Sequence, residues 1–222
     1  MRLTRFQIAL SILVFSLLIA TSAFANTVQM TYVGHGGAVA QDGSPYVGYP
    51  YDVVINGNST ATALLCTSFA NSQSLGQTWT ATASPFLQGI ATSMFGPSMT
   101  LDYKAAGLIF KAMLGGQVTA NQATWAVWGL FSNFSGDTRA YNYFNSTPQF
   151  TNIEATYLAL ATTAKNSAFN GLILYTPLNA QPGVGPQEFI GYSAVPEPSS
   201  LMLMGTGLIG LAGTLRRKFA KS

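Results

Sequence analysis

Hydrophobic and polar positions alternate, as they do in half-buried β-strands, in several short stretches of the first half of the chain. Residues 27–33 alternate first, and residues 49–55 follow after a Gly-rich loop. An Asn-Gly pair then signals a tight turn, so residues 60–69 are expected to pair with 49–55 as a β-hairpin. Residues 77–83 are predicted to form a further strand.

The spacing of hydrophobic positions then changes from two residues to the helical period. Residues 103–114 place their apolar side chains on one helical face, and residues 119–131 and 151–165 do the same. The second and third of these segments begin with capping-box patterns. Two short strands, 172–176 and 188–193, are expected to close the region.

This order of strands, helices and strands predicts an α+β fold. Residues 26–193 are expected to form a single extracellular α+β domain, in which antiparallel strands flank a central group of about three helices. The flanking segments, 1–25 and 194–222, are expected to add an N-terminal signal helix and a C-terminal transmembrane helix.

The N-terminal segment, 1–25, has the order of a secretory signal peptide. Arg2 and Arg5 precede an apolar run, and Ala23 and Ala25 form an A-x-A site after it. We therefore expect signal peptidase to cleave after Ala25. A retained signal anchor is the alternative.

The C-terminal segment has three parts in a fixed order, which are a Pro-Glu-Pro signature, an apolar run and a basic end. The parts are Pro196, Glu197 and Pro198, then residues 199–215, then Arg216, Arg217 and Lys218. An apolar run of about 17 residues is at the lower edge of the length that spans a bilayer. The basic end would stay on the cytoplasmic side. A permanent membrane anchor through this helix is the simplest interpretation.

This three-part tail resembles the PEP-CTERM sorting signal of Gram-negative bacteria that make exopolysaccharide. The resemblance implies an exosortase, a membrane protease-transpeptidase, as a partner that removes the tail. It also implies a protein that is anchored in the inner membrane before processing and then lies at the cell surface or outside the cell. The tail does not identify the domain before it, since many unrelated domains carry the same signal.

Charge separates the two ends from the region between them. The whole chain has a net charge of +3 and a pI near 9.0, but most of its basic residues lie in the two terminal segments. The middle region has more acidic than basic residues and no cluster of Lys and Arg, which excludes nucleic-acid binding. It is rich in Thr, Ser, Asn, Gln, Gly and Tyr. This composition suits contact with extracellular polysaccharide, because Tyr and Trp offer flat apolar faces with a polar group.

Residues with catalytic or metal-binding chemistry are few. His35 is the only histidine, and it lies in a Gly-rich loop that matches neither a P-loop nor a dinucleotide fingerprint. One His and one Cys do not make a usual zinc site, so we expect no metal and no cofactor. A G-x-S-x-G motif is also absent. We therefore expect a protein that is not an enzyme, with an envelope-polymer hydrolase that uses His35 as a remote alternative.

Cys66 is the only cysteine, so an intramolecular disulfide is impossible. It is a buried inert thiol, a partner for another chain, or a group with a chemical role. Residues 65–67 resemble the cysteine motif of bacterial thioester adhesion domains, and residues 121–128 resemble their Gln-x-Ala-(Ile/Val)-Trp motif. The resemblance implies a thioester between Cys66 and Gln122 that captures an amine or hydroxyl on another surface.

The alignment of the second motif has two registers. If residues 126–128 are aligned with Ala-Ile-Trp, the glutamine of the family falls on Thr124, which cannot form a thioester. If Gln122 is taken as the glutamine, Trp125 comes one residue early. The fold of that family without its bond is therefore a further expectation.

An aromatic cluster lies on and directly after the second predicted helix. Most of it is expected to be core, and the alternative is an exposed patch at Tyr141 and Tyr143 that stacks on sugar. We thus predict an exported surface or matrix protein with a structural or adhesive role linked to exopolysaccharide or biofilm. The thioester adhesin is the first alternative.

Overall fold

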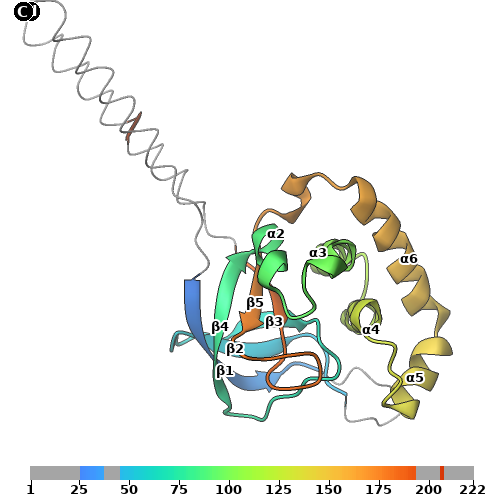
Figure 1. Ribbon diagram of the computed structural model, residues 1–222, viewed down its shortest axis with the longest axis horizontal. Coiled ribbons are helices and arrows are strands. Elements are labelled where there is room, and N and C mark those ends of the chain that lie inside the picture. The colour runs from blue at the N-terminus through green and yellow to red at the C-terminus, as the bar shows by residue number, and fades with distance from the viewer. Residues whose placement is uncertain (1–25, 38–45, 194–205, 208–222) are drawn as a thin grey trace, which may run out of the picture. The chain divides into compact units, whose positions relative to one another are not determined.

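The computed structural model describes residues 26–37, 46–193 and 206–207 (Figure 1). Residues Ala25–Ser193 form one compact unit. The predicted cleavage residues Ala23 and Ala25, the Pro-Glu-Pro signature and the basic end at 216–218 lie outside the described residues.

Six antiparallel strands close into a barrel in the order β1-β2-β3-β6-β5-β4, with β4 paired to β1 (Figure 1). The strands are β1 (Asn26–His35), β2 (Tyr51–Ile55), β3 (Thr62–Cys66), β4 (Thr78–Pro85), β5 (Leu172–Pro177) and β6 (Phe189–Tyr192). Each strand has a hydrogen-bonded neighbour on both sides. The barrel therefore has no open edge.

The interior of the barrel is filled by alternate side chains, as the pleat of a strand requires. Met30, Val53, Leu64, Ala81 and Phe189 are completely buried and belong to one core cluster. The alternation visible in the sequence of β1 follows from this, because its polar positions face solvent.

Five α-helices lie between β4 and β5 in the sequence and gather on one side of the barrel (Figure 1). They are α2 (Phe86–Gly89), α3 (Thr100–Leu114), α4 (Ala120–Phe131), α5 (Thr138–Asn145) and α6 (Pro148–Thr163). The short 3-10 turns are η1 (Ile90–Thr92), η2 (Pro97–Met99) and η3 (Asn166–Phe169). Helices α3, α4 and α6 pack against one another, and α4 also contacts β3.

A second core lies between the helices and the outer surface of the barrel. Leu65 of β3 and Ile190 of β6 pair across the two strands and pack with Ile109, Phe110 and Val127 of the helices. Strand β3 is therefore buried on both faces, with Leu64 and Cys66 in the barrel cluster and Leu65 beneath the helices. This explains why residues 63–66 are continuously apolar rather than alternating.

The predicted arrangement of strands that flank a central group of about three helices is wrong. The strands close on one another, and the helices cover one side of the resulting barrel. Closure depends on the pairings β3–β6 and β1–β4, which join segments far apart in the sequence. Hydrophobic periodicity indicates which face of a strand is buried and does not indicate its partners.

The fold-class prediction also included a C-terminal transmembrane helix, which falls almost entirely outside the described part of the chain. No helix within 26–37, 46–193 and 206–207 is long and apolar enough to cross a membrane. The segment on which that helix was predicted, 199–215, lies outside the described residues except for Thr206 and Gly207.

Candidate functional site

Helix α5 is capped by Asp137, whose carboxylate accepts hydrogen bonds from both the helix start and Tyr46. Its Oδ1 accepts hydrogen bonds from the backbone N–H groups of Arg139 and Ala140 at 3.1 and 3.0 Å. Its Oδ2 accepts a hydrogen bond from the hydroxyl of Tyr46. The Tyr46 hydroxyl, followed by the Ala140 N–H, holds the pKa of Asp137 below its usual value. The start of α5 is therefore well anchored.

One face of α5 borders an open depression of about 540 Å³. Ala140 and Phe144 point into the protein and are buried, which leaves the opposite face to solvent. The residues that line the depression are Thr138, Arg139, Asn142, Tyr143 and Ser146. All five carry a hydrogen-bonding group, and only Arg139 is charged.

Tyr143 supplies the aromatic wall of this depression. Its ring is half-buried and lies 5.0 Å from the ring of Trp125 and 5.6 Å from that of Phe150, measured between centroids. Trp125 and Phe150 are themselves buried in an aromatic cluster. The Tyr143 ring is thus supported from behind and borders the depression beside polar groups, an arrangement that suits contact with a sugar.

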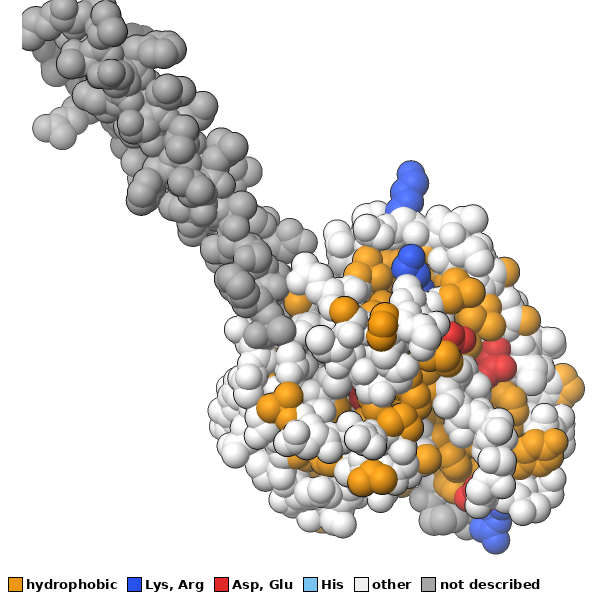
Figure 2. All heavy atoms as spheres, in the orientation of Figure 1, with side chains coloured by type: hydrophobic (Ala, Val, Ile, Leu, Met, Phe, Trp, Pro, Cys, Tyr) orange, Lys and Arg blue, Asp and Glu red, His pale blue; other side chains and the backbone are white. Residues whose placement is uncertain are grey.

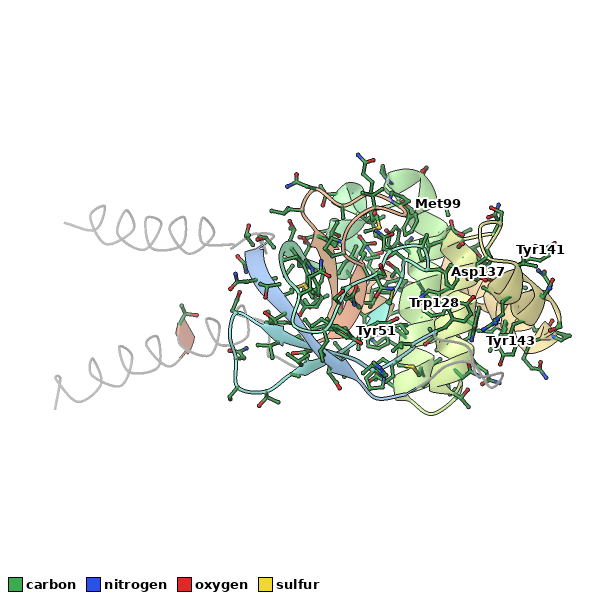
Figure 3. All side chains as sticks on the ribbon, turned by 90° about the horizontal axis from the view of Figure 1, so that it is seen from below. Tyr51, Met99, Trp128, Asp137, Tyr141 and Tyr143 are labelled. Carbon is green, nitrogen blue, oxygen red and sulfur yellow. The ribbon has the colours of Figure 1, made fainter. Side chains whose placement is uncertain are left out.

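Tyr141 does not share this surface. Its side chain is 50% exposed, but it does not line the depression. Two positions along a helix differ by about 200° in direction, so Tyr141 and Tyr143 leave α5 on different sides (Figure 3). The structure therefore places only one of the two predicted tyrosines in the depression.

The two residues of the predicted thioester have separate local partners. Cys66 is completely buried in the barrel, and its thiol donates to the carbonyl oxygen of Ser68 at 3.4 Å. Burial raises the pKa of Cys66 to about 12, which keeps the thiol protonated and unreactive. Gln122 forms a capping box at the start of α4, where its carboxamide oxygen accepts from the Thr119 N–H at 3.0 Å.

Thr124, the alternative position for the glutamine of that motif, is buried in α4. Its hydroxyl donates to the carbonyl oxygen of Ala120 at 2.8 Å and accepts from the Tyr49 N–H at 3.2 Å. The residue therefore links α4 to the segment before β2. Neither register of the motif places a side-chain amide in a hydrogen bond with Cys66 within the described part of the chain.

Glu188, which the hydrophobic pattern did not single out, is a completely buried carboxyl group next to β6. Burial raises its pKa. The carboxyl group accepts hydrogen bonds from the hydroxyls of Tyr103, Thr67 and Thr176 and from the Met94 N–H. These partners come from α3, β5 and the segments beside β3 and η1. Only its place at the start of the short predicted strand 188–193, directly before Phe189 and Ile190, could have indicated burial.

His35 is exposed at the end of β1, where it pairs with Tyr51 of β2. Within the described ranges, no group of three or more His, Cys, Asp or Glu side chains is placed to hold a metal ion. The exposed imidazole and the buried Cys66 thiol therefore occupy different environments.

Residues 194–218 match a family model described as the PEP-CTERM protein-sorting motif. The chain carries a PEP-CTERM sorting motif. This confirms the sorting signal that the tail predicted, and it marks the protein as an exported exosortase substrate that ends up at the cell surface or outside the cell. The exosortase that processes a PEP-CTERM protein is itself a membrane protein. No curated protein and no solved structure matches this chain.

Proposed function

We propose that this PEP-CTERM protein has a non-enzymatic adhesive or structural role and binds extracellular polysaccharide through the depression on α5. The observation that supports this proposal is the placement of Tyr143, whose ring is held by Trp125 and Phe150 at the wall of an open, polar depression. A ring fixed before binding loses little conformational entropy on contact with a sugar.

The shape of the depression suits a polymer more than an isolated small molecule. It is shallow and open, so each contact with a sugar residue would be weak. A polysaccharide repeats the same unit many times, and repeated weak contacts between many protein copies and one polymer give strong overall binding. An adhesive or structural role needs this kind of contact.

The location of the depression also supports the proposal. The start of β1 lies level with the start of β6, as the successive pairs Asn26–Ala83, Ala83–Tyr175 and Tyr175–Phe189 show. Strand β6 then runs on to Tyr192, toward the end of the barrel at which β1 begins. Both ends of the domain therefore leave the barrel from the same end. Helix α5 lies on the opposite side of the domain from the start of β1 (Figures 1 and 3). A domain attached through either end would present α5 outward.

Two tyrosines on the same helix provide a matched test. Binding of the exported protein to the exopolysaccharide of its host would be measured by co-sedimentation. We expect Tyr143→Ala to weaken binding about fivefold, because it removes the supported ring. Tyr143→Phe keeps the ring and its packing, and Tyr141→Ala removes an exposed tyrosine outside the depression, so both should bind nearly as well as the unaltered protein.

Equal losses for Tyr143→Ala and Tyr141→Ala would contradict the proposal, as would binding that none of the variants changes. Circular dichroism of each variant would separate loss of the site from loss of the fold. Among the described residues, no contact supports a Cys66 thioester or a hydrolase that uses His35, and neither is proposed as a second function.

A further inference from the structure

Arg139 gives the depression on α5 a positive charge that no lining acid neutralises. Of the five lining residues, only Arg139 is ionic, and its side chain is exposed. Charged side chains are sparse elsewhere on the domain, and the face in Figure 2 is mostly polar and uncharged or apolar. A negatively charged ligand would therefore be attracted to the depression rather than to the domain surface as a whole.

The guanidinium group of Arg139 is available to a ligand. Its backbone N–H donates to Asp137, but within 26–37, 46–193 and 206–207 no hydrogen bond or ion pair of the guanidinium itself is found. Asp137 is the nearest acid in the sequence, and both of its oxygens already accept hydrogen bonds from Tyr46 and from the start of α5. Its charge stabilises the helix end and also attracts that of Arg139, which contributes to the lowered pKa of Asp137, but within the described ranges no side-chain hydrogen bond or ion pair joins the two groups.

The spacing of the lining residues determines where the parts of a ligand would lie. Arg139 and Tyr143 are four residues apart on the helix, which brings their Cβ atoms within about 6 Å on one face. Thr138, Asn142 and Ser146 form a parallel row with the same spacing. A sugar ring that stacks on Tyr143 would thus lie beside the polar row, and a carboxylate on that ring would reach the guanidinium.

We propose that the depression selects an acidic sugar residue, whose carboxylate pairs with Arg139 while its ring stacks on Tyr143. This inference rests on the function proposed above and narrows its ligand to polysaccharides that contain uronic acid or a similar carboxylated sugar. Arginine suits this task because its planar fork binds a carboxylate through two parallel hydrogen bonds.

A pair of ligands that differ only in charge tests the proposal. The probes are a short oligogalacturonate and the same oligomer with its carboxylates methyl-esterified, each titrated calorimetrically into the exported protein. We expect the acidic oligomer to bind about fivefold more tightly than the ester. We expect this preference to shrink as salt concentration rises, because the charges are exposed to solvent.

Two variants of equal net charge provide the control. Arg139→Gln should remove the preference for the acidic oligomer, whereas Lys165→Gln, which alters an exposed basic residue outside the depression, should retain it. A preference that survives in Arg139→Gln would overturn the inference, and so would equal binding of the two oligomers or binding of neither.

The two proposals fail in distinguishable ways. If the preference is absent while Tyr143→Ala still weakens binding to the host exopolysaccharide, the polysaccharide-binding function stands and the acidic selectivity is wrong. If Tyr143→Ala and Tyr141→Ala bind that polymer equally, the proposed function itself is wrong.

Discussion

Glu188 shows how one buried residue joins several parts of this fold. Its carboxyl group accepts two hydrogen bonds on each oxygen, from Tyr103 and Thr67 on one and from Met94 and Thr176 on the other. A buried carboxyl group without such partners would be strongly destabilising. The four donors therefore make this residue part of the contact between helices and barrel.

Substitution of Glu188 should separate the effect of its shape from that of its charge. Glu188→Ala leaves buried donors without partners, and we expect it to lower the free energy of unfolding by about 3 kcal/mol in urea titrations. Glu188→Gln keeps the volume and part of the hydrogen bonding, so a smaller loss is expected. Equal losses in the two variants would contradict this account.

Burial of Glu188 determines the direction in which pH should change the stability of the protein. The pKa of Glu188 is raised in the folded protein above its ordinary value of 4.5, so the folded state binds the proton more tightly. Its contribution to stability is therefore greatest below pH 4.5 and falls as pH rises through the folded-state pKa. The pKa values of Asp102 and Glu154 are also raised, so the measured quantity is the difference between the unaltered protein and Glu188→Gln.

At the scale of single elements, the hydrophobic pattern located most of the strands and the longer helices. Predicted segments 103–114 and 119–131 correspond closely to α3 and α4. Helix α5 was missed because it is short and buries only Ala140 and Phe144, too few positions to reveal a helical period. The failure to predict α5 mattered most for the functional prediction, because the candidate site lies on that helix.

The N-cap residue of α5, Asp137, leads to a testable prediction about this helix. Asp137→Ala removes two hydrogen bonds to the helix start and the bond from Tyr46, and should destabilise α5 by about 1 kcal/mol. Hydrogen exchange of the α5 amides would measure this loss. Asp137→Asn is the matched control, because asparagine also caps helices and has no carboxylate to titrate.

The same carboxylate sets the acid sensitivity of α5. The pKa of Asp137 is lowered in the folded protein, so its contribution is present above its ordinary value of 3.8 and is lost as pH falls through the folded-state pKa. The protection factors of the α5 amides, which correct for the slower intrinsic exchange in acid, should fall as pH falls for the unaltered protein and change less for Asp137→Asn. Identical acid sensitivity in both would show that another group controls the helix.

At the scale of the whole molecule, the sequence revealed the sorting motif, whereas only the structure revealed the barrel. The sorting motif could be recognised from sequence because its three parts are consecutive along the chain. The barrel could not, because its closure depends on contacts such as Cys66–Phe189 between distant segments. The depression depends on the same long-range packing, since Trp125 and Phe150, which support Tyr143, come from α4 and α6.

The sorting motif has its own test in the native host. Replacement of Pro196, Glu197 and Pro198 by alanine should leave the tail on the protein, which an intact mass measurement would detect. Pro182→Ala, a change in a loop of the domain, should be processed normally. Processing of the altered motif at the normal rate would show that exosortase recognises another part of the tail.

The closed barrel also affects how many copies of this protein can share a crowded space. An unpaired strand edge acts as a template on which another chain can add a strand, and repeated addition produces fibres. Every strand of this barrel is already paired on both sides. Within the described part of the chain, concentrated copies therefore offer one another no free strand edge on which fibres could grow.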